Sequence, residues 1–338
     1  MTALAQGTHG GHPADFFVCD IFDAAPKTDM GGMEHPMFSL STRPDRTIRH
    51  YARGDTRITV TPSVRGRATI HDKDILIYCI SQLMAALNAG RTIARKLTLT
   101  AHDLLIATRR DTGGDSYVRL VEAFERLAGT RITTNIVTGD QETTSGFGLI
   151  EAWEIVRKSR ATRGGPAGRM VSVSVTLSDW LFRAVQAKSV LTLSRDYFTL
   201  RKPLERRIYE IARKHCGQQR LWRASVATLH EKAGSDAPLR VFRAALRRMI
   251  QTNGLPDYVL SEETGDIICV TRRGMGPDQA GLAPLRSDTL DDARRMAPGM
   301  DVHALEAEWR GFWVTSGRPV LRSADAAFLG WLKGRVTR

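Results

Sequence analysis

Four arginines between residues 239 and 251 have the type and spacing needed to bind nucleic acid. In the segment LRVFRAALRRMIQ, Arg240, Arg243 and Arg247 recur at the spacing of one helix face, and Arg248 lies beside them. No acidic residue interrupts this segment, so it contains no carboxylate that could neutralise them. Guanidinium groups on such a face can grip phosphates or bond bidentately to guanine edges in the major groove. The alternative is a solvated basic face without a ligand.

A second group of basic residues precedes this segment, between residues 201 and 223. It would extend the positive surface, and we expect contacts to the phosphate backbone from its members. The candidates are Arg206, Arg207, Arg213, Lys214, Arg220 and Arg223.

The chain shows few signatures of catalysis. It has no Gly-Lys dipeptide, which a phosphate-binding loop for ATP requires, and no His-x-His pair for a metal. The four cysteines, Cys19, Cys79, Cys216 and Cys269, include no Cys-x-x-Cys pair, so neither a zinc site nor a disulfide framework is indicated. We therefore predict no catalytic residue, no metal site and no cofactor.

Asp72 and Asp74 could still support a metal-dependent activity, because their spacing is that of a metal-binding pair. They leave open a nuclease or primase that would use these and other scattered acids with Mg²⁺. Acidic residues in the first turn of a helix also stabilise its dipole, and we prefer this simpler interpretation.

The arginine segment is positioned by a predicted helix whose other face is apolar. Three-and-four spacing places Leu239, Phe242, Leu246 and Met249 toward a core. Predicted helices precede it at Pro203 to Gly217 and Trp222 to Gly234, and predicted strands follow it at Tyr258 to Ser261 and Ile267 to Arg272. This order is typical of a winged helix-turn-helix in which residues 239–251 form the reading helix.

The tip of the predicted hairpin is acidic. It carries Glu262, Glu263 and Asp266, which phosphates would repel. We therefore expect the reading helix to make the close DNA contacts and this wing to stand off.

An earlier part of the chain predicts the same architecture again. Helices are expected at 72–88, 101–108 and 116–127, and strands at 131–137 and 147–156 around a polar loop at 138–146. A hairpin at 46–51 and 56–61 comes before them. In this copy Arg119 and Arg126 are balanced by Glu122 and Glu125, so we expect it to serve protein contacts or grip the DNA backbone.

The fold class is accordingly α+β, with tandem winged-helix domains and a small helical C-terminal module. Residues 1–35 form a flexible acidic segment with an aromatic island at 15–22, which either docks a partner or packs back on the domain. The domains are expected at 36–190 and 191–275, a linker at 276–287 and the module at 288–338. Its expected helices, 301–314 and 323–332, contain Trp309, Trp313 and Trp331, which we expect to fill a core; stacking on single-stranded bases is the alternative.

Charge is concentrated in the middle of the chain. The formal net charge is +13, with −4 on residues 1–35 and +1 on residues 276–338, so the central body carries +16. Such a body usually meets a polyanion, and nucleic acid is the first candidate, although a GC-rich genome also favours arginine. No apolar run is long enough to span a bilayer and no secretory signal is evident, so we expect a bacterial cytoplasmic protein without membrane partners.

Several segments resemble the replication initiator protein A family of alphaproteobacterial plasmids, the RepA-like proteins. The resemblance extends over about residues 15–273 and rests on the segments MEHP at 33–36, FSL at 38–40, DKDILIYCISQL at 72–83, LSDWL at 177–181, YF with Leu200 at 197–200, and ERRIYEIARKHCG at 205–217. It implies two winged-helix domains that bind repeated origin sites, or iterons. It also implies a dimer that represses its own gene and monomers that start replication. Residues 308–331 look more loosely like the C-terminal modules of primosomal and helicase-loading proteins.

The leading hypothesis is a non-enzymatic, origin-binding plasmid replication initiator. Its partners would be double-stranded origin DNA, the host replication initiator, the replicative helicase and a second copy in the repressor form. The alternative is a dedicated transcriptional repressor with the same DNA contacts and no role in replication.

Overall fold

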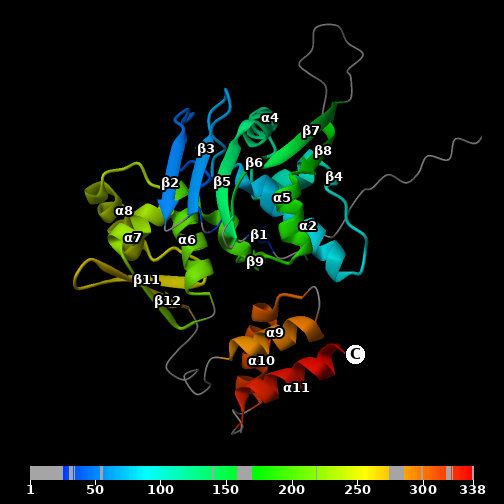
Figure 1. Ribbon diagram of the computed structural model, residues 1–338, viewed down its shortest axis with the longest axis vertical. Helices are drawn as coiled ribbons and strands as arrows, with labels where there is room; N and C mark the ends of the chain where they lie inside the picture. Colours follow the sequence, from blue (N-terminus) through cyan, green and yellow to red (C-terminus); the bar gives the residue numbers. More distant parts are fainter. Residues whose placement is uncertain are drawn as a thin grey trace, which may run out of the picture.

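The computed structural model shows a mixed α+β protein (Figure 1). Its buried apolar residues form three separate hydrophobic cores. The structure describes residues 26–29, 33, 35–53, 56–138, 141–157, 170–217, 219–273, 285–297, 300–316, 321 and 323–336. The aromatic island at 15–22, most of the segment 1–35 and most of the linker at 276–287 lie outside the described residues.

The first body contains the three helices expected in the earlier part of the chain, but its hairpin joins residues 150–157 to 170–177 instead of the expected 131–137 to 147–156, which changes its set of elements. These are α2 (Lys73–Asn88), β4 (Lys96–Leu99), α3 (Ala101–Ala107), α4 (Gly114–Gly129), β7 (Ile150–Arg157) and β8 (Met170–Leu177), followed by α5 (Asp179–Gln186). The three strands form an antiparallel sheet in the order β4-β8-β7. Thr100 begins α3, because its hydroxyl accepts a hydrogen bond from the Asp103 amide at 3.1 Å.

A four-stranded sheet is added to this body, and it corrects one expectation. β2 (Arg49–Arg53), β3 (Thr56–Thr61), β5 (Arg131–Thr138) and β6 (Gln141–Gly148) pair in that order. Residues 141–146 were expected in a polar loop and 147–156 in one strand, but β6 pairs with β5, and Leu149 separates it from β7. The threonines of β6 are β-branched and suit a strand, and as an edge strand with Thr144 exposed it needs few apolar residues.

The second body repeats the order of helices and strands of the first. It comprises η1 (Arg195–Thr199), α6 (Pro203–His215), β10 (Leu221–Ser225), α7 (Val226–Ala233), α8 (Leu239–Thr252), β11 (Tyr258–Glu263) and β12 (Ile267–Arg272). Its sheet order, β10-β12-β11, matches β4-β8-β7. Both sheets therefore place the last strand between the other two.

One helix boundary in this body differs from the prediction. Residues 222–225 were expected to begin a helix, but they lie in β10 and pair with Ile267–Val270 of β12. The helix begins only after Ser225, whose hydroxyl accepts a hydrogen bond from the Thr228 amide at 3.0 Å. Gly234 ends α7 in the left-handed conformation, at φ 63°.

The C-terminal module packs three helices around its own core. They are α9 (Ser287–Met296), which was not predicted, α10 (Val302–Thr315) and α11 (Ala324–Val336). Trp309 and Trp313 are buried, which confirms the packing interpretation for these two residues. None of the helices in the described ranges is long and apolar enough to cross a membrane.

Asp301 joins this module to the rest of the protein. Its carboxylate caps α10 by accepting from the His303 amide at 3.0 Å. It also lies 3.8 Å from the Lys27 ammonium and accepts a hydrogen bond from the Thr192 hydroxyl. Lys27 and Thr192 face each other in the short ladder of β1 (Lys27–Asp29) and β9 (Val190–Thr192), so the module is attached to the body at this ladder.

Candidate nucleic-acid interface

Helix α8 is held by one apolar face and presents a basic face. Phe242, Leu246 and Met249 are buried in the core of the second body, as predicted. Leu239 was expected to join them but is 37% exposed, because it is the first residue of the helix and lies beyond the core. Asn253 ends the helix at φ 49°. The helix can thus meet a partner along most of its length.

Two of the four arginines on this helix are paired with the acidic tip, meaning Glu262 and Glu263 at the end of β11 and Asp266 in the turn that leads to β12. The Nε and Nη2 atoms of Arg247 donate to the two carboxylate oxygens of Glu262, both at 2.8 Å. Arg243 donates to Asp266. The prediction of four unneutralised arginines is therefore wrong for these two. The carboxylates that reach them follow the helix in sequence and come close only when the hairpin folds back.

A third pair involves β10, where Arg223 donates through Nε and Nη2 to Glu263 at 2.9 and 3.2 Å. These bonds have an electrostatic consequence. Hydrogen bonding by Arg247 lowers the pKa of Glu262, and hydrogen bonding by Arg223 lowers the pKa of Glu263. Both carboxylates are ionised at neutral pH.

Arg240 and Arg248 remain available on α8. Both are exposed, and within the part of the chain that is described neither side chain has a hydrogen-bond or ion-pair partner. Arg220 is exposed in the same way near the start of β10, whereas Lys214 is half-buried near the end of α6. Arg240 and Arg248 of the reading helix and Arg220 of the expected phosphate contacts thus lie at the surface of the second body without a described partner.

Three other predicted phosphate contacts are buried, and that assignment is corrected. Arg206 is 2% exposed; its Nε donates to the Leu200 carbonyl at 2.7 Å and its Nη1 to Asp74 at 2.5 Å. Arg207 donates to the carbonyls of Lys232 and Met33 at 2.6 and 2.9 Å. Arg213 donates to the Thr192 carbonyl at 2.6 Å. These guanidinium groups hold the fold together and cannot reach a phosphate.

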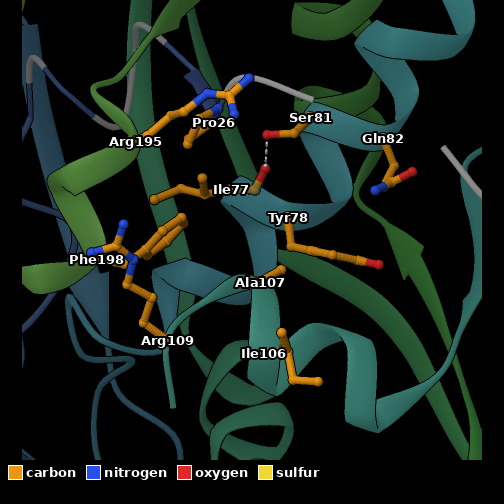
Figure 2. Close-up of a pocket in the computed structure, with 10 residues that line it drawn as sticks. All are labelled: Pro26, Ile77, Tyr78, Ser81, Gln82, Ile106, Ala107, Arg109, Arg195 and Phe198. Carbon is orange, nitrogen blue, oxygen red and sulfur yellow. Dashed lines mark hydrogen bonds between the residues drawn. The ribbon is translucent and has the colours of Figure 1, made fainter. Parts of the chain in front are cut away.

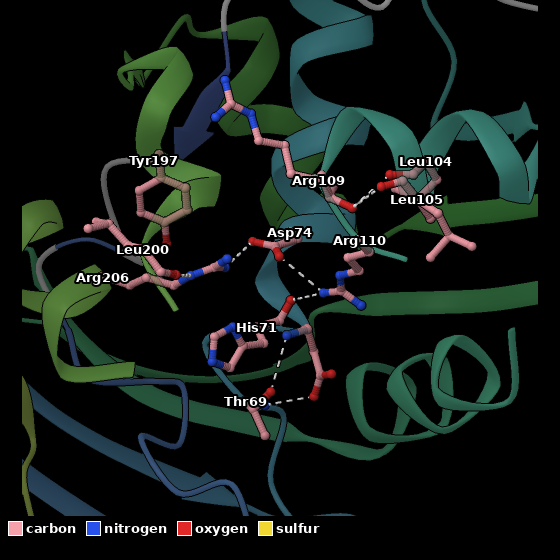
Figure 3. A network of polar contacts seen from close by, with 12 residues as sticks. Thr69, His71, Asp74, Leu104, Leu105, Arg109, Arg110, Tyr197, Leu200 and Arg206 are labelled. Atoms are coloured by element: carbon pink, nitrogen blue, oxygen red, sulfur yellow. Dashed lines mark hydrogen bonds and ion pairs between the residues drawn. The ribbon is translucent and has the colours of Figure 1, made fainter. Parts of the chain in front are cut away.

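Arg206 belongs to a charged junction between the two bodies (Figure 3). We define this junction as the start of α2 together with the residues that pair with it. The Asp74 carboxylate accepts a hydrogen bond from Arg206 of α6 and a second one, at 3.1 Å, from Arg110. Lys73 forms an ion pair with Glu210 of α6 at 3.0 Å, and both side chains are fully buried. The first body is therefore fixed to the second by ion pairs inside the protein.

The same junction contradicts the metal-dependent interpretation of Asp72 and Asp74. Asp72 accepts from Nε and Nη2 of Arg126 of α4 at 2.7 and 2.9 Å. Guanidinium groups occupy both carboxylates, so neither is available to a magnesium ion. In the described part of the chain, no group of three or more His, Cys, Asp or Glu side chains could hold a metal.

Two hollows lie near this junction. One, of about 260 Å³, is formed by α2, the end of α3 and η1, and Figure 2 shows Arg109, Arg195 and Phe198 on one side and Tyr78 and Gln82 on the other. Its described lining contains no acid, histidine or cysteine that could act as a base or nucleophile. Cys79 of the same helix is fully buried, which raises its pKa to about 12.

The second hollow is larger and positive. It has a volume of about 660 Å³ and lies beside α4, where Arg43, Arg109, Arg119 and Arg201 contribute to its wall. The sequence did not indicate this cluster as a whole, because its members come from four separate segments, of which only Arg201 lies in the basic group at 201–223.

Comparison with known proteins agrees with this picture. The family model described as "Replication initiator protein A" matches residues 27–260. A "Putative replication protein" of Wigglesworthia glossinidia brevipalpis is 38% identical over 263 residues, which are 77% of this chain and 94% of the relative.

One solved structure is similar at the level of the fold. A crystal structure of domains 2 and 3 of RctB is similar with a TM-score of 0.51 at 14% identity, covering 68% of this chain and 92% of that one. Another structure of RctB domains 2-3 gives a TM-score of 0.47 at 16% identity, with 72% and 96% covered.

Proposed function

Because the chain belongs to the replication initiator protein A family, we propose that it is a non-enzymatic plasmid replication initiator that binds repeated sites at an origin. In this proposal both bodies are winged-helix domains, with boundaries at 36–190 and 191–275. The second reads sequence through α8, and recruited host initiator and helicase open the DNA. The same DNA contacts would let a dimer repress the gene, with monomers acting at the origin.

The observation that carries the proposal is the pair Arg240 and Arg248 on α8. An exposed helix with a buried apolar face can enter a major groove without unfolding its domain. Two exposed guanidinium groups without intramolecular partners are ready to bind phosphate and release counterions. The central charge of the chain favours the same partner.

The first body supports a different role in the same complex. Arg119 and Glu125 of α4 are paired with Asp115 at 4.0 Å and Arg65 at 2.8 Å, so the helix offers little free charge. We infer that this body grips the DNA backbone or contacts a second copy, and that the C-terminal module meets host proteins.

The test is footprinting on the DNA that flanks the gene, followed by gel-shift titration of the protected site. Arg240→Ala with Arg248→Ala is expected to weaken binding by about 10- to 100-fold. Arg295→Ala, which changes an exposed arginine on α9 outside the two bodies, is the matched control. Binding that is unchanged in the double variant would overturn the proposal.

Replication and repression are then separated by one further measurement. A plasmid that carries only this gene and its flanking repeats is expected to be maintained in a suitable host. If it is lost while the protein still binds the repeats, the chain acts as a dedicated repressor and the replication role is wrong.

A further inference from the structure

The acidic tip lies against the residues that the proposed function assigns to DNA reading. Arg247 meets Glu262 through two hydrogen bonds at 2.8 Å, Arg223 meets Glu263 through two, and Arg243 meets Asp266. All three acids lie at the tip of one hairpin, where Glu262 and Glu263 end β11 and Asp266 lies in the turn, and only Arg243 among the paired arginines is half-buried. Exposed ion pairs contribute little to stability, so the fold does not require this arrangement.

The geometry of Arg247 leaves one particular edge of its guanidinium group open. A guanidinium has five N–H donors in a fixed fork. Glu262 occupies the edge formed by Nε and Nη2, while Nη1 has no partner within the described residues. The open end, Nη1 with the second hydrogen of Nη2, has the spacing that matches the O6 and N7 atoms of guanine. The carboxylate therefore holds the arginine in a fixed orientation without blocking the edge that would meet a base.

The same carboxylate acts against binding through phosphate alone. A phosphate that approaches Arg247 meets a cation already neutralised, so no counterion is released in exchange. It also meets the negative charge of Glu262 and Glu263, which are ionised at neutral pH. Contact with a base edge avoids most of this repulsion, because the base carries no net charge.

We propose that Glu262 is a specificity-determining residue that positions Arg247 to read guanine, and that the acidic tip lowers the affinity of the protein for non-cognate DNA. This inference rests on the proposed function, since it assigns a task within the same DNA-binding face. Arg240 and Arg248 supply the unspecific attraction, and the acidic tip prevents the remaining arginines from adding to it.

The experiment compares Glu262→Gln with the natural protein on the footprinted site and on random-sequence duplex, across a range of salt. The variant is expected to bind random duplex about tenfold more tightly, with a salt slope steeper by about 0.9, and to lose about tenfold in its preference for the site. Glu151→Gln is the matched control, because it removes an exposed carboxylate paired with Arg95 at 2.7 Å on another sheet. It should change neither quantity.

A second variant tests the reading role directly. Arg247→Lys keeps the charge but loses the fork, so it should keep its affinity for random duplex and lose its preference at one guanine position. An unchanged preference in Glu262→Gln, in a protein that does discriminate, overturns this inference alone. A natural protein that binds site and random duplex equally overturns the proposed function and the reading role together.

Discussion

The arginines of this protein fall into two groups according to what their guanidinium groups touch. Arg206, Arg207 and Arg213 donate to buried carbonyls and carboxylates, whereas the side chains of Arg240 and Arg248 have no hydrogen-bond or ion-pair partner among the described residues. Composition cannot separate the groups, because the residue type and the net charge are the same. A buried guanidinium is a structural element, and only a free one adds to attraction for DNA.

Among single residues, His71 offers a test through pH. It lies at the junction beside Arg206 and Arg110, with Asp74 and Asp72 opposing them. Burial, followed by the charge of Arg206, lowers the pKa of His71 to about 4. Its ordinary value near 6.5 applies in the unfolded chain, so the unfolded state binds more protons between these two values.

The free energy of unfolding should therefore be highest above pH 6.5 and fall by about 2 to 3 kcal/mol as the pH drops to 4, on account of His71. Urea titrations at several pH values measure this. His71→Gln should flatten that part of the curve, and His50→Gln at an exposed position should not. A curve of the same slope in His71→Gln would show that another group is responsible.

At the scale of elements, Gly234 is a position where two segments approach closely. It ends α7 at φ 63°, and a methyl group there would overlap Pro36. Gly234→Ala should therefore cost both backbone strain, about 1 kcal/mol, and the overlap, about 1 to 3 kcal/mol.

The matched variant is Gly265→Ala in the turn between β11 and β12. Gly265 has φ 81° but open space around it, so only the strain is expected. Thermal unfolding of both variants gives the difference. Equal losses in the two proteins would mean that the approach of Pro36 to α7 is not tight.

The junction between α2 and α6 is the second element-scale test. Arg206→Leu removes one partner and leaves Asp74 buried with less compensation, which should cost about 3 to 5 kcal/mol. Changing Asp74 and Arg206 together to leucine should recover part of this loss. Arg183→Ala, at an exposed pair of α5, should leave the urea midpoint unchanged. A midpoint unchanged in Arg206→Leu would show that the pair is dispensable.

Sequence reasoning was most successful where the signal is local. The spacing of Phe242, Leu246 and Met249 predicted α8 and its buried face, and the Thr100 and Ser225 caps lie where short side chains precede apolar runs. It failed where a partner is distant. Asp74 lies far from Arg206 in the chain, and Glu262 reaches Arg247 only after the hairpin turns back, so neither pair leaves a pattern along the sequence.

At the scale of the whole molecule, Asp301 determines how the C-terminal module is attached. Its pKa is lowered despite burial, because Lys27 and Thr192 stabilise the charged form. The attachment is therefore present above its ordinary value near 3.8 and lost as the pH falls through the lowered value.

Two substitutions separate the cap from the attachment. Asp301→Ser keeps a capping hydroxyl for α10 and loses the charge, whereas Asp301→Ala loses both and should cost about 1 kcal/mol more in the module. Hydrogen exchange of β1 and β9 should increase in both variants. If amide hydrogen exchange of β1 and β9 is unchanged in Asp301→Ser, the charge of Asp301 does not hold the module.

The junction also limits how this protein can be recombined. A first body taken from a different member of the family would bring its own side chains to positions 72–74, opposite Arg206 and Glu210. A mismatch there would bury a charged side chain without a partner of opposite charge. An apolar interface, in contrast, tolerates the exchange of side chains of similar volume. Chimaeras divided between the two bodies should fold poorly unless the residues on both sides of the junction are exchanged together. We therefore expect that the two bodies can be exchanged between family members only as a joined pair.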